Sequence, residues 1–417
     1  MLHITFKTNI VMKNLRLLFC VLLAISFANS VFAGSPFTKV TTVGSKGRTG
    51  AIMFAIGPDF YMGGGIGFKD FWVYHSDSNT IRKLPDIPGD DTSRTLAVGF
   101  SIGNKGYVGL GYDGSGKLIL KNDLWQFDPA TTTWTQKANF IGNACEASFV
   151  FVVGNVAYIG GGSNTLALYD SFYSYNSLID KWKPLGTVPM GNSVFQAAFT
   201  VNYSGYISTG QVGGFGTETT ATYQYDTTSN TWNQKADFPG GARQSTTAMV
   251  VGNMAYVGLG QTAYTNAYND FYSYDPALDQ WAKINSFPGG ARFESCAASN
   301  GTEAYFAFGL DLSSNIYNDL WRFDAPLVTG IEPIKSSIAH ISIYPDPAAG
   351  YLYLSVNNDI RFNSLSIRDV KGKILKTIYP DASPGQLKID ISGFAQGVYF
   401  VNVNTGQAIE SRKFIVY

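Results

Sequence analysis

A short phrase containing tyrosine and glycine returns six times along the chain, and this repeat constrains the fold more than any other feature. The tyrosines that close the second hydrophobic stretch of each unit follow one another at nearly even intervals: Tyr61, Tyr107, Tyr158, Tyr206, Tyr256 and Tyr305. A period of about 50 residues with four short strands per unit is typical of a propeller. One unit cannot bury both faces of its small sheet, so the units must stack in a ring. The sequence therefore predicts an all-β, six-bladed propeller.

The order of strands within a unit predicts how the ring closes. Each unit runs from a strand of small and apolar residues through a tight turn and a second strand to an aromatic strand and a short outer strand. Trp134, Trp182, Trp232 and Trp281 mark the outer strand at a constant spacing before the start of the next unit, and the sixth unit has no such tryptophan. The same spacing counted back from Arg48, where the first unit starts, gives Phe37. Residues 36–43 are therefore expected to pair into the last blade, which removes an open sheet edge.

The N-terminus has the pattern of a targeting segment. Lys13 and Arg16 precede an apolar run from Leu17 to Phe27, and small residues precede a cut after Ala33. The run is shorter than the roughly 20 residues that a membrane span needs. We expect a signal peptide over residues 1–33 and an exported mature chain without a transmembrane span. The propeller is expected over residues 36–326, followed by a linker over 327–340.

The repeat resembles a known family. Residues 122–129 (Asn-Asp-Leu-Trp-Gln-Phe-Asp-Pro) and 238–243 (Phe-Pro-Gly-Gly-Ala-Arg) are similar to the kelch repeat. The resemblance extends over nearly the whole of residues 36–326 and implies a six-bladed kelch propeller of the exported bacterial kind often labelled galactose-oxidase-like. The copper oxidases of that label need two histidines and a Tyr–Cys pair. Here His75 occupies a turn and His340 the linker, so we expect no copper, no other metal and no cofactor.

After residue 326 the period stops and a second all-β segment follows. Its alternating strands over residues 341–417 predict a small immunoglobulin-like sandwich. The segment resembles the type A C-terminal sorting domain of the type IX secretion system, through a Tyr-Pro-Asp-Pro motif, a Gly-Lys turn, a Gly-Val-Tyr strand and a basic residue before the last strand. The residues that carry this resemblance are Tyr344, Pro345, Asp346, Pro347, Gly372, Lys373, Gly397, Tyr399 and Lys413. It implies contact with that secretion machinery, and a secreted or outer-membrane surface location.

Charge and cysteine content narrow the functional classes. Thirty basic residues balance thirty acidic ones, which gives no reason to expect a nucleic acid partner. The expected mature chain keeps Cys145 and Cys296 in non-equivalent positions of blades three and six. Both a disulfide between them and two separate buried thiols are compatible with an oxidising compartment.

The best candidate for a ligand site is a set of arginines at one repeat position. Arg48, Arg94, Arg243 and Arg292 stand at one fixed spacing before the aligned tyrosine in four of the six units, with Glu146 and Glu294 nearby. Convergent guanidinium groups at one mouth of the central channel would suit an acidic ligand, whereas arginines of a repeat consensus can equally tie the blades together. Tyr112, Tyr264 and Tyr268 in variable loops offer rings on which sugars could stack.

Two functions follow from these patterns. The first is a secreted or cell-surface, non-catalytic module that binds a protein or a glycan. The second is an enzyme similar to the sialic-acid mutarotases (N-acetylneuraminate epimerase type), six-bladed kelch propellers in which an arginine holds the sugar carboxylate and a glutamate moves the proton. The fold alone does not decide between them.

Overall fold

The computed structural model describes residues 35–89, 93–114, 118–164, 166–214, 216–263, 265–325, 341–356, 364–369, 373–379, 386–404 and 409–417. In these residues the regular secondary structure consists of β-strands alone. The signal peptide expected over residues 1–33, the linker with His340, Tyr264 and Gly372 lie outside the described residues. No helix in the described part of the chain has the length and apolar character that a membrane crossing requires.

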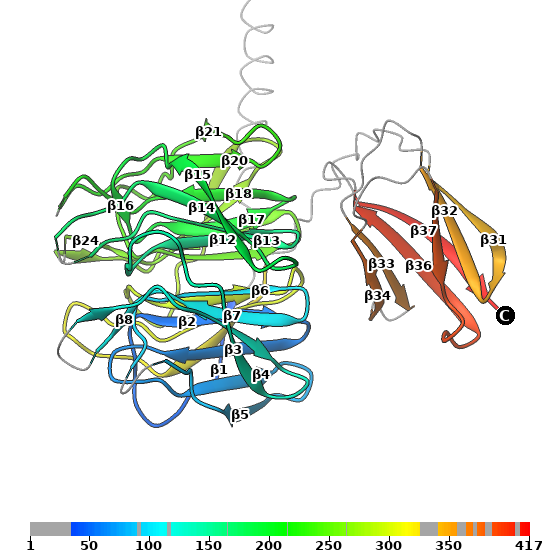
Figure 1. The fold of residues 1–417 in the computed structure, drawn as a ribbon, viewed down its shortest axis with the longest axis horizontal. Coiled ribbons are helices and arrows are strands. Elements are labelled where there is room, and N and C mark those ends of the chain that lie inside the picture. Colours follow the sequence, from blue (N-terminus) through cyan, green and yellow to red (C-terminus); the bar gives the residue numbers. More distant parts are fainter. Residues whose placement is uncertain are drawn as a thin grey trace, which may run out of the picture.

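Six antiparallel four-stranded sheets form the propeller (Figure 1). The innermost strands contact one another in a closed ring; they are β2 (Ala51–Ile56), β6 (Val98–Ile102), β12 (Phe149–Val153), β17 (Ala197–Val201), β22 (Thr247–Val251) and β28 (Cys296–Ser299). The second strands are β3 (Asp59–Gly64), β7 (Lys105–Gly109), β13 (Val156–Gly160), β18 (Ser204–Ser208), β23 (Met254–Gly258) and β29 (Ala304–Ala307). The third strands are β4 (Phe71–His75), β10 (Leu124–Asp128), β14 (Ser171–Asn176), β20 (Thr222–Asp226), β26 (Phe271–Asp275) and β30 (Asp319–Phe323). The outer strands are β5 (Thr80–Leu84), β11 (Thr133–Lys137), β15 (Lys181–Thr187), β21 (Thr231–Lys235), β27 (Gln280–Ile284) and β1 (Phe37–Thr42). The predicted all-β propeller is thus confirmed.

The first strand of the chain completes the last blade. β1 pairs antiparallel with β30, and Phe37 lies opposite Phe323, just as Trp134 lies opposite Phe127 in the second blade. Trp134 also packs 5.1 Å from Phe71 of the preceding blade, between ring centroids, and Phe37 packs 5.0 Å from Phe271 of its preceding blade. Phe37 therefore takes the place of the outer tryptophan in both the ladder and the core between blades, as the constant spacing in the sequence predicts.

A glycine at one position in every unit joins neighbouring blades. Its N–H donates to the carbonyl oxygen of the residue at the arginine position of the next unit, over 2.8 to 3.0 Å. The six glycines are Gly65, Gly111, Gly162, Gly210, Gly260 and Gly309, with φ between 78° and 106°. A Cβ on Gly260 would lie 2.6 Å from the carbonyl oxygen of Gln244. Glycine is required here because a side chain would clash with backbone and would strain φ.

The C-terminal segment forms a separate set of strands. They pair in the order β34-β33-β36-β37-β31-β32-β35 and bury a shared apolar core that includes Leu354, Ile367, Val401 and Phe414. The strands are β31 (Ile341–Ala349), β32 (Tyr351–Val356), β33 (Ser364–Asp369), β34 (Ile374–Ile378), β35 (Gln386–Asp390), β36 (Gly397–Asn404) and β37 (Ile409–Val416). This arrangement agrees with the small sandwich expected from sequence.

Candidate functional site

The four arginines at the repeat position are buried and already paired. Each is at most 2% exposed, and each donates from both terminal nitrogens to the carboxylate of an aspartate that directly precedes or begins the third strand of its own blade. The closest N–O distances are 2.6 Å for Arg48–Asp70, Arg94–Asp123 and Arg243–Asp270, and 2.7 Å for Arg292–Asp319. Although burial acts against it, the hydrogen bonds from Arg94 hold the pKa of Asp123 below its ordinary value.

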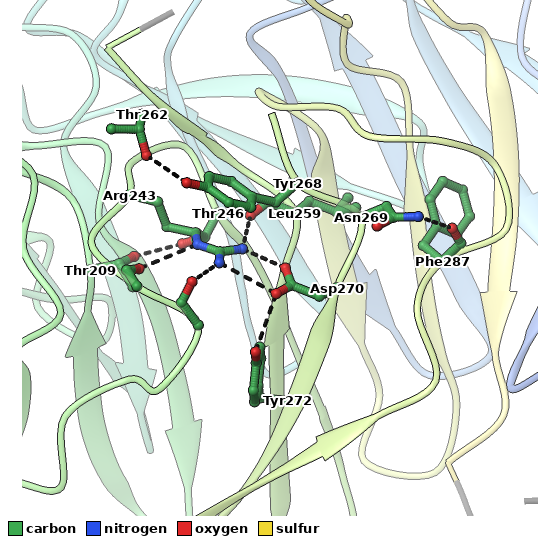
Figure 2. Close-up of polar contacts among 12 residues, drawn as sticks. Thr209, Arg243, Thr246, Leu259, Thr262, Tyr268, Asn269, Asp270, Tyr272 and Phe287 are labelled. Carbon is green, nitrogen blue, oxygen red and sulfur yellow. Dashed lines mark hydrogen bonds and ion pairs between the residues drawn. The ribbon is translucent and has the colours of Figure 1, made fainter. Parts of the chain in front are cut away.

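Each arginine also closes a loop of its own blade. Figure 2 shows Arg243 between Asp270, the backbone of Leu259 and the ring of Tyr268. The guanidinium carbon of Arg243 lies 3.7 Å from the centroid of Tyr268, and that of Arg292 lies 3.9 Å from the centroid of Tyr317. Tyr268, expected as an exposed platform for a sugar, is therefore used by an arginine of its own blade. This stacking covers the guanidinium faces of Arg243 and Arg292, whose terminal nitrogens are already bound.

The two blades without the arginine also lack its aspartate. Cys145 and Ser171 stand at the two positions in the third blade, and Ser193 and Ala221 in the fourth. The pair is therefore present or absent as a unit, which is the behaviour of an ion pair that stabilises a blade. The charge of the four arginines is neutralised inside the protein and does not form the free cationic cluster that an acidic ligand would need.

A ring of six residues, two positions after each arginine position, surrounds the mouth of the central channel. We call it the mouth ring; its members are Gly50, Leu96, Ala147, Phe195, Ser245 and Glu294. All six have a positive φ, between 49° and 65°. The N–H groups of Leu96, Ala147, Phe195 and Ser245 each donate to the carbonyl oxygen of the preceding member, over 2.9 to 3.2 Å. This chain of bonds offsets the cost of left-handed conformations in non-glycine residues.

The chain of backbone bonds stops on both sides of Glu294. Among the described residues no such bond links Ser245 to Glu294 or Glu294 to Gly50. Instead the hydroxyl of Thr49 donates a short hydrogen bond to the Glu294 carboxylate. Glu294 is thus the one member of the mouth ring with an ionisable side chain. At this point of the ring, the side-chain hydrogen bond from Thr49 stands in place of a backbone bond.

Two carboxyl groups at this mouth have perturbed pKa values. Burial raises the pKa of Glu294, while the hydrogen bond from Thr49 opposes the shift. Burial, and then the negative charge of Glu294, raise the pKa of Glu146. Burial, and then the charges of both glutamates, raise the pKa of Tyr112. Carboxyl groups with raised pKa values at a concave site are candidates for proton transfer.

Polar side chains without a hydrogen-bond partner are concentrated at the same mouth. They are buried: the amide of Gln196 (8% exposed) at both its oxygen and nitrogen, the amide oxygens of Gln244 and Gln261 (1% each), and the hydroxyl of Ser245 (8%). Gln196, Ser245 and Glu294 line a cavity of about 140 Å³ inside the mouth ring. Buried polar groups normally find partners, so the atoms of Gln196 and Ser245 are suited to a polar ligand or to water.

The cavity continues as a channel between the innermost strands. Small residues such as Ala51, Gly99 and Ala198 line it, and it reaches the opposite mouth at the tight turns near Gly154 and Gly252. No group of three metal-ligating side chains occurs in the part of the chain that the structure describes. Cys145 and Cys296 are free and buried, which favours two separate thiols over a disulfide.

The sorting residues that can be placed lie on the C-terminal strands or directly beside one. Tyr344, Pro345, Asp346 and Pro347 are on β31, Lys373 directly precedes β34, Gly397 and Tyr399 are on β36, and Lys413 is on β37. The Tyr399 hydroxyl donates to the carbonyl oxygen of Ala395 over 2.6 Å, and its ring packs against Phe414. These contacts give Tyr399 a role in the core of this segment.

Taken with this geometry, the comparisons define the class of the protein. Residues 342–417 match the family described as "Secretion system C-terminal sorting domain". The solved "Structure of YjhT" is similar to the chain with a TM-score of 0.58 and 14% identity, over 67% of this chain and 96% of that one, which shows the fold alone. The chain combines a six-bladed β-propeller with a segment that matches a C-terminal sorting domain of the type IX secretion system, and a domain of this kind implies export.

Curated relatives match parts of the propeller. "N-acetylneuraminate epimerase" of Haemophilus influenzae is 29% identical over 51% of this chain and 52% of its own length. The protein of the same name from Vibrio cholerae is 33% identical over 26% of this chain and 28% of its own length. "N-(sulfonatooxy)prop-2-enimidothioate sulfolyase" of Thlaspi arvense is 32% identical over 24% of this chain and 29% of its own length. The chain thus spans about half or less of the curated relatives' length.

Proposed function

We propose that this exported propeller binds a sugar at the mouth ring and catalyses an epimerase-type proton transfer on it, with Glu294 and Glu146 as the acid–base pair. One observation carries the proposal: the Glu294 carboxyl, whose pKa is raised by burial, lines a cavity with Gln196 and Ser245, whose buried polar atoms lack hydrogen-bond partners. Hydroxyl groups of a sugar would pair with those atoms. The names of the relatives from Haemophilus influenzae and Vibrio cholerae support the same class of reaction.

The environments of the two glutamates suggest different roles. The Thr49 hydroxyl stabilises the ionised form of Glu294, which suits a base. The negative charge of Glu294 favours the protonated form of Glu146, which suits an acid. Glu294 would accept the proton of the anomeric hydroxyl while Glu146 donates a proton to the ring oxygen, and the ring opens to a carbonyl. After rotation about the adjacent C–C bond, the reverse transfers close the ring as the other anomer, so no co-reactant is consumed.

A mutarotation assay tests the proposal. Pure anomers of reducing sugars, with N-acetylneuraminate included, are dissolved with the purified protein, and their approach to anomeric equilibrium is followed by NMR. General acid–base catalysis contributes roughly 10²–10⁴-fold, so Glu294→Gln and Glu146→Gln should each slow the reaction by about that factor. Glu303→Gln makes the same charge change near the tight turn at Gly301, away from the mouth ring, and should leave the rate unchanged. Equal rates with wild type and both mouth variants would refute the catalytic roles.

A non-catalytic binding module is the second candidate. Phe195 of the mouth ring is half-buried beside the polar groups of the cavity, which is an arrangement that suits stacking of a sugar without any chemistry. Binding of a glycan without a change in its anomeric rate would favour this function over the first.

Export and location form a separate part of the proposal. We infer that residues 1–33 direct the chain across the inner membrane and that residues 341–417 engage the type IX machinery, leaving the propeller secreted or at the outer-membrane surface. The match of residues 342–417 supports this route. Fusing residues 330–417 to a neutral cargo should move the cargo to the surface of a competent host. Cargo retained in the periplasm would count against the inference.

A further inference from the structure

The charge that lines the cavity inside the mouth ring is negative. At the arginine position of the repeat, every guanidinium group is bound by an aspartate of its own blade. Glu294 lines the cavity together with Gln196 and Ser245. The four guanidinium groups are therefore not free to hold a carboxylate, and a carboxylate placed in the cavity would lie beside that of Glu294.

The unpartnered atoms of the cavity lining also suit an uncharged sugar. The amide oxygen of Gln196 accepts hydrogen bonds, whereas its nitrogen and the Ser245 hydroxyl can donate. Sugar hydroxyls both donate and accept, so they can pair with all three atoms, whereas a carboxylate offers only acceptors and would leave the Gln196 oxygen unpaired. Leaving a buried polar group unpaired is unfavourable, so the cavity is better matched to a hydroxyl-rich ligand.

We propose that the site takes an uncharged, hydroxyl-rich sugar and discriminates against sugar acids. This inference rests on the proposed function and names its substrate class. Charge complementarity and hydrogen-bond complementarity support it independently, since the first depends on Glu294 and the second on Gln196 and Ser245. It separates this chain from an enzyme whose substrate is N-acetylneuraminate.

A matched pair of ligands tests the inference. N-acetylneuraminic acid and its methyl ester share their stereochemistry and hydroxyl groups and differ at neutral pH in one charge. Binding of each to the full-length protein is measured by titration calorimetry at neutral pH, together with uncharged hexoses and N-acetylhexosamines. We expect the ester or an uncharged sugar to bind at least about tenfold more tightly than the acid.

Variants separate the two arguments. Glu294→Gln should reduce the preference for the ester, because it removes the negative charge that lines the cavity, while Glu303→Gln should preserve it. Gln196→Leu should weaken the binding of uncharged sugars without improving the binding of the acid. Equal or tighter binding of the acid would overturn this inference and leave the proposed function standing. Binding of no sugar by the folded protein would overturn both.

Discussion

Replacing Arg292 by serine tests whether the repeat arginines stabilise the blades. Arg292 and Asp319 are 1% and 9% exposed at their side chains, and their closest atoms are 2.7 Å apart. Arg292 also donates to the carbonyl oxygens of Phe308 and Gly289, over 3.2 and 2.9 Å. The substitution leaves the Asp319 carboxylate buried without its cation, which costs about 3–5 kcal/mol. The free energy of unfolding, measured with urea, should fall by that amount.

The chain itself supplies the matched variant. The fourth blade has serine and alanine where the sixth has arginine and aspartate, at Ser193 and Ala221. Arg292→Ser with Asp319→Ala reproduces that pair and leaves no unpaired charge, so it should recover at least about 2 kcal/mol of the loss. As a control, Arg322→Ser breaks a pair whose side chains are 44% and 51% exposed and should cost less than about 1 kcal/mol. A double variant as unstable as the single one would refute the reasoning.

Three further perturbations have defined outcomes. Gly260→Ala should lower the free energy of unfolding by about 2 kcal/mol or more, because φ is 90° and the new Cβ would clash with the Gln244 carbonyl. Gly252→Ala, where a Cβ would meet open space, should cost less in the same urea assay. Glu294→Gln should raise Tm at neutral pH, because burial raises the pKa of Glu294 in the folded protein and the ionised carboxylate therefore costs stability. The difference in Tm should vanish below about pH 4.5, where the carboxyl group is protonated in both the folded and the unfolded state. An equal difference at all pH values would contradict this reasoning. Deleting residues 36–43 should lower Tm sharply, since β1 is the outer strand of the last blade, and an unchanged melt would contradict the closure.

The sequence was sufficient to predict the architecture because each blade repeats the same pattern of four strands. The constant spacing between the outer tryptophan and the next unit assigned Phe37 to the outer tryptophan position, and in the structure Phe37 lies opposite Phe323 at that position. The same alignment contained the partner of the arginines. An aspartate before or at the start of the third strand is present in four units and absent from the two units without arginine, and this joint pattern was the signal for a structural ion pair.

The mouth was only partly predictable. Glu146, Glu294 and Gln244 could be placed near it from the alignment, because they adjoin the arginine position. The sequence does not reveal that the amides of Gln196 and Gln261 lack hydrogen-bond partners, since the two residues stand at different positions of their repeats. Whether a buried amide finds a partner depends on neighbouring blades, and that is fixed by packing across the ring rather than by local sequence.

The pH dependence of mutarotation tests the acid–base pair most directly. With an uncharged reducing sugar at saturation, the rate for the wild-type protein should follow a bell, because Glu294 must be ionised and Glu146 protonated. Glu294→Gln and Glu146→Gln should each lower the maximum by about 10²-fold or more and remove one limb of the bell. A rate equal to that of the uncatalysed reaction at every pH, with the sugar bound, would contradict catalysis and leave a binding module. A bell unchanged in both variants would contradict the assignment of the site.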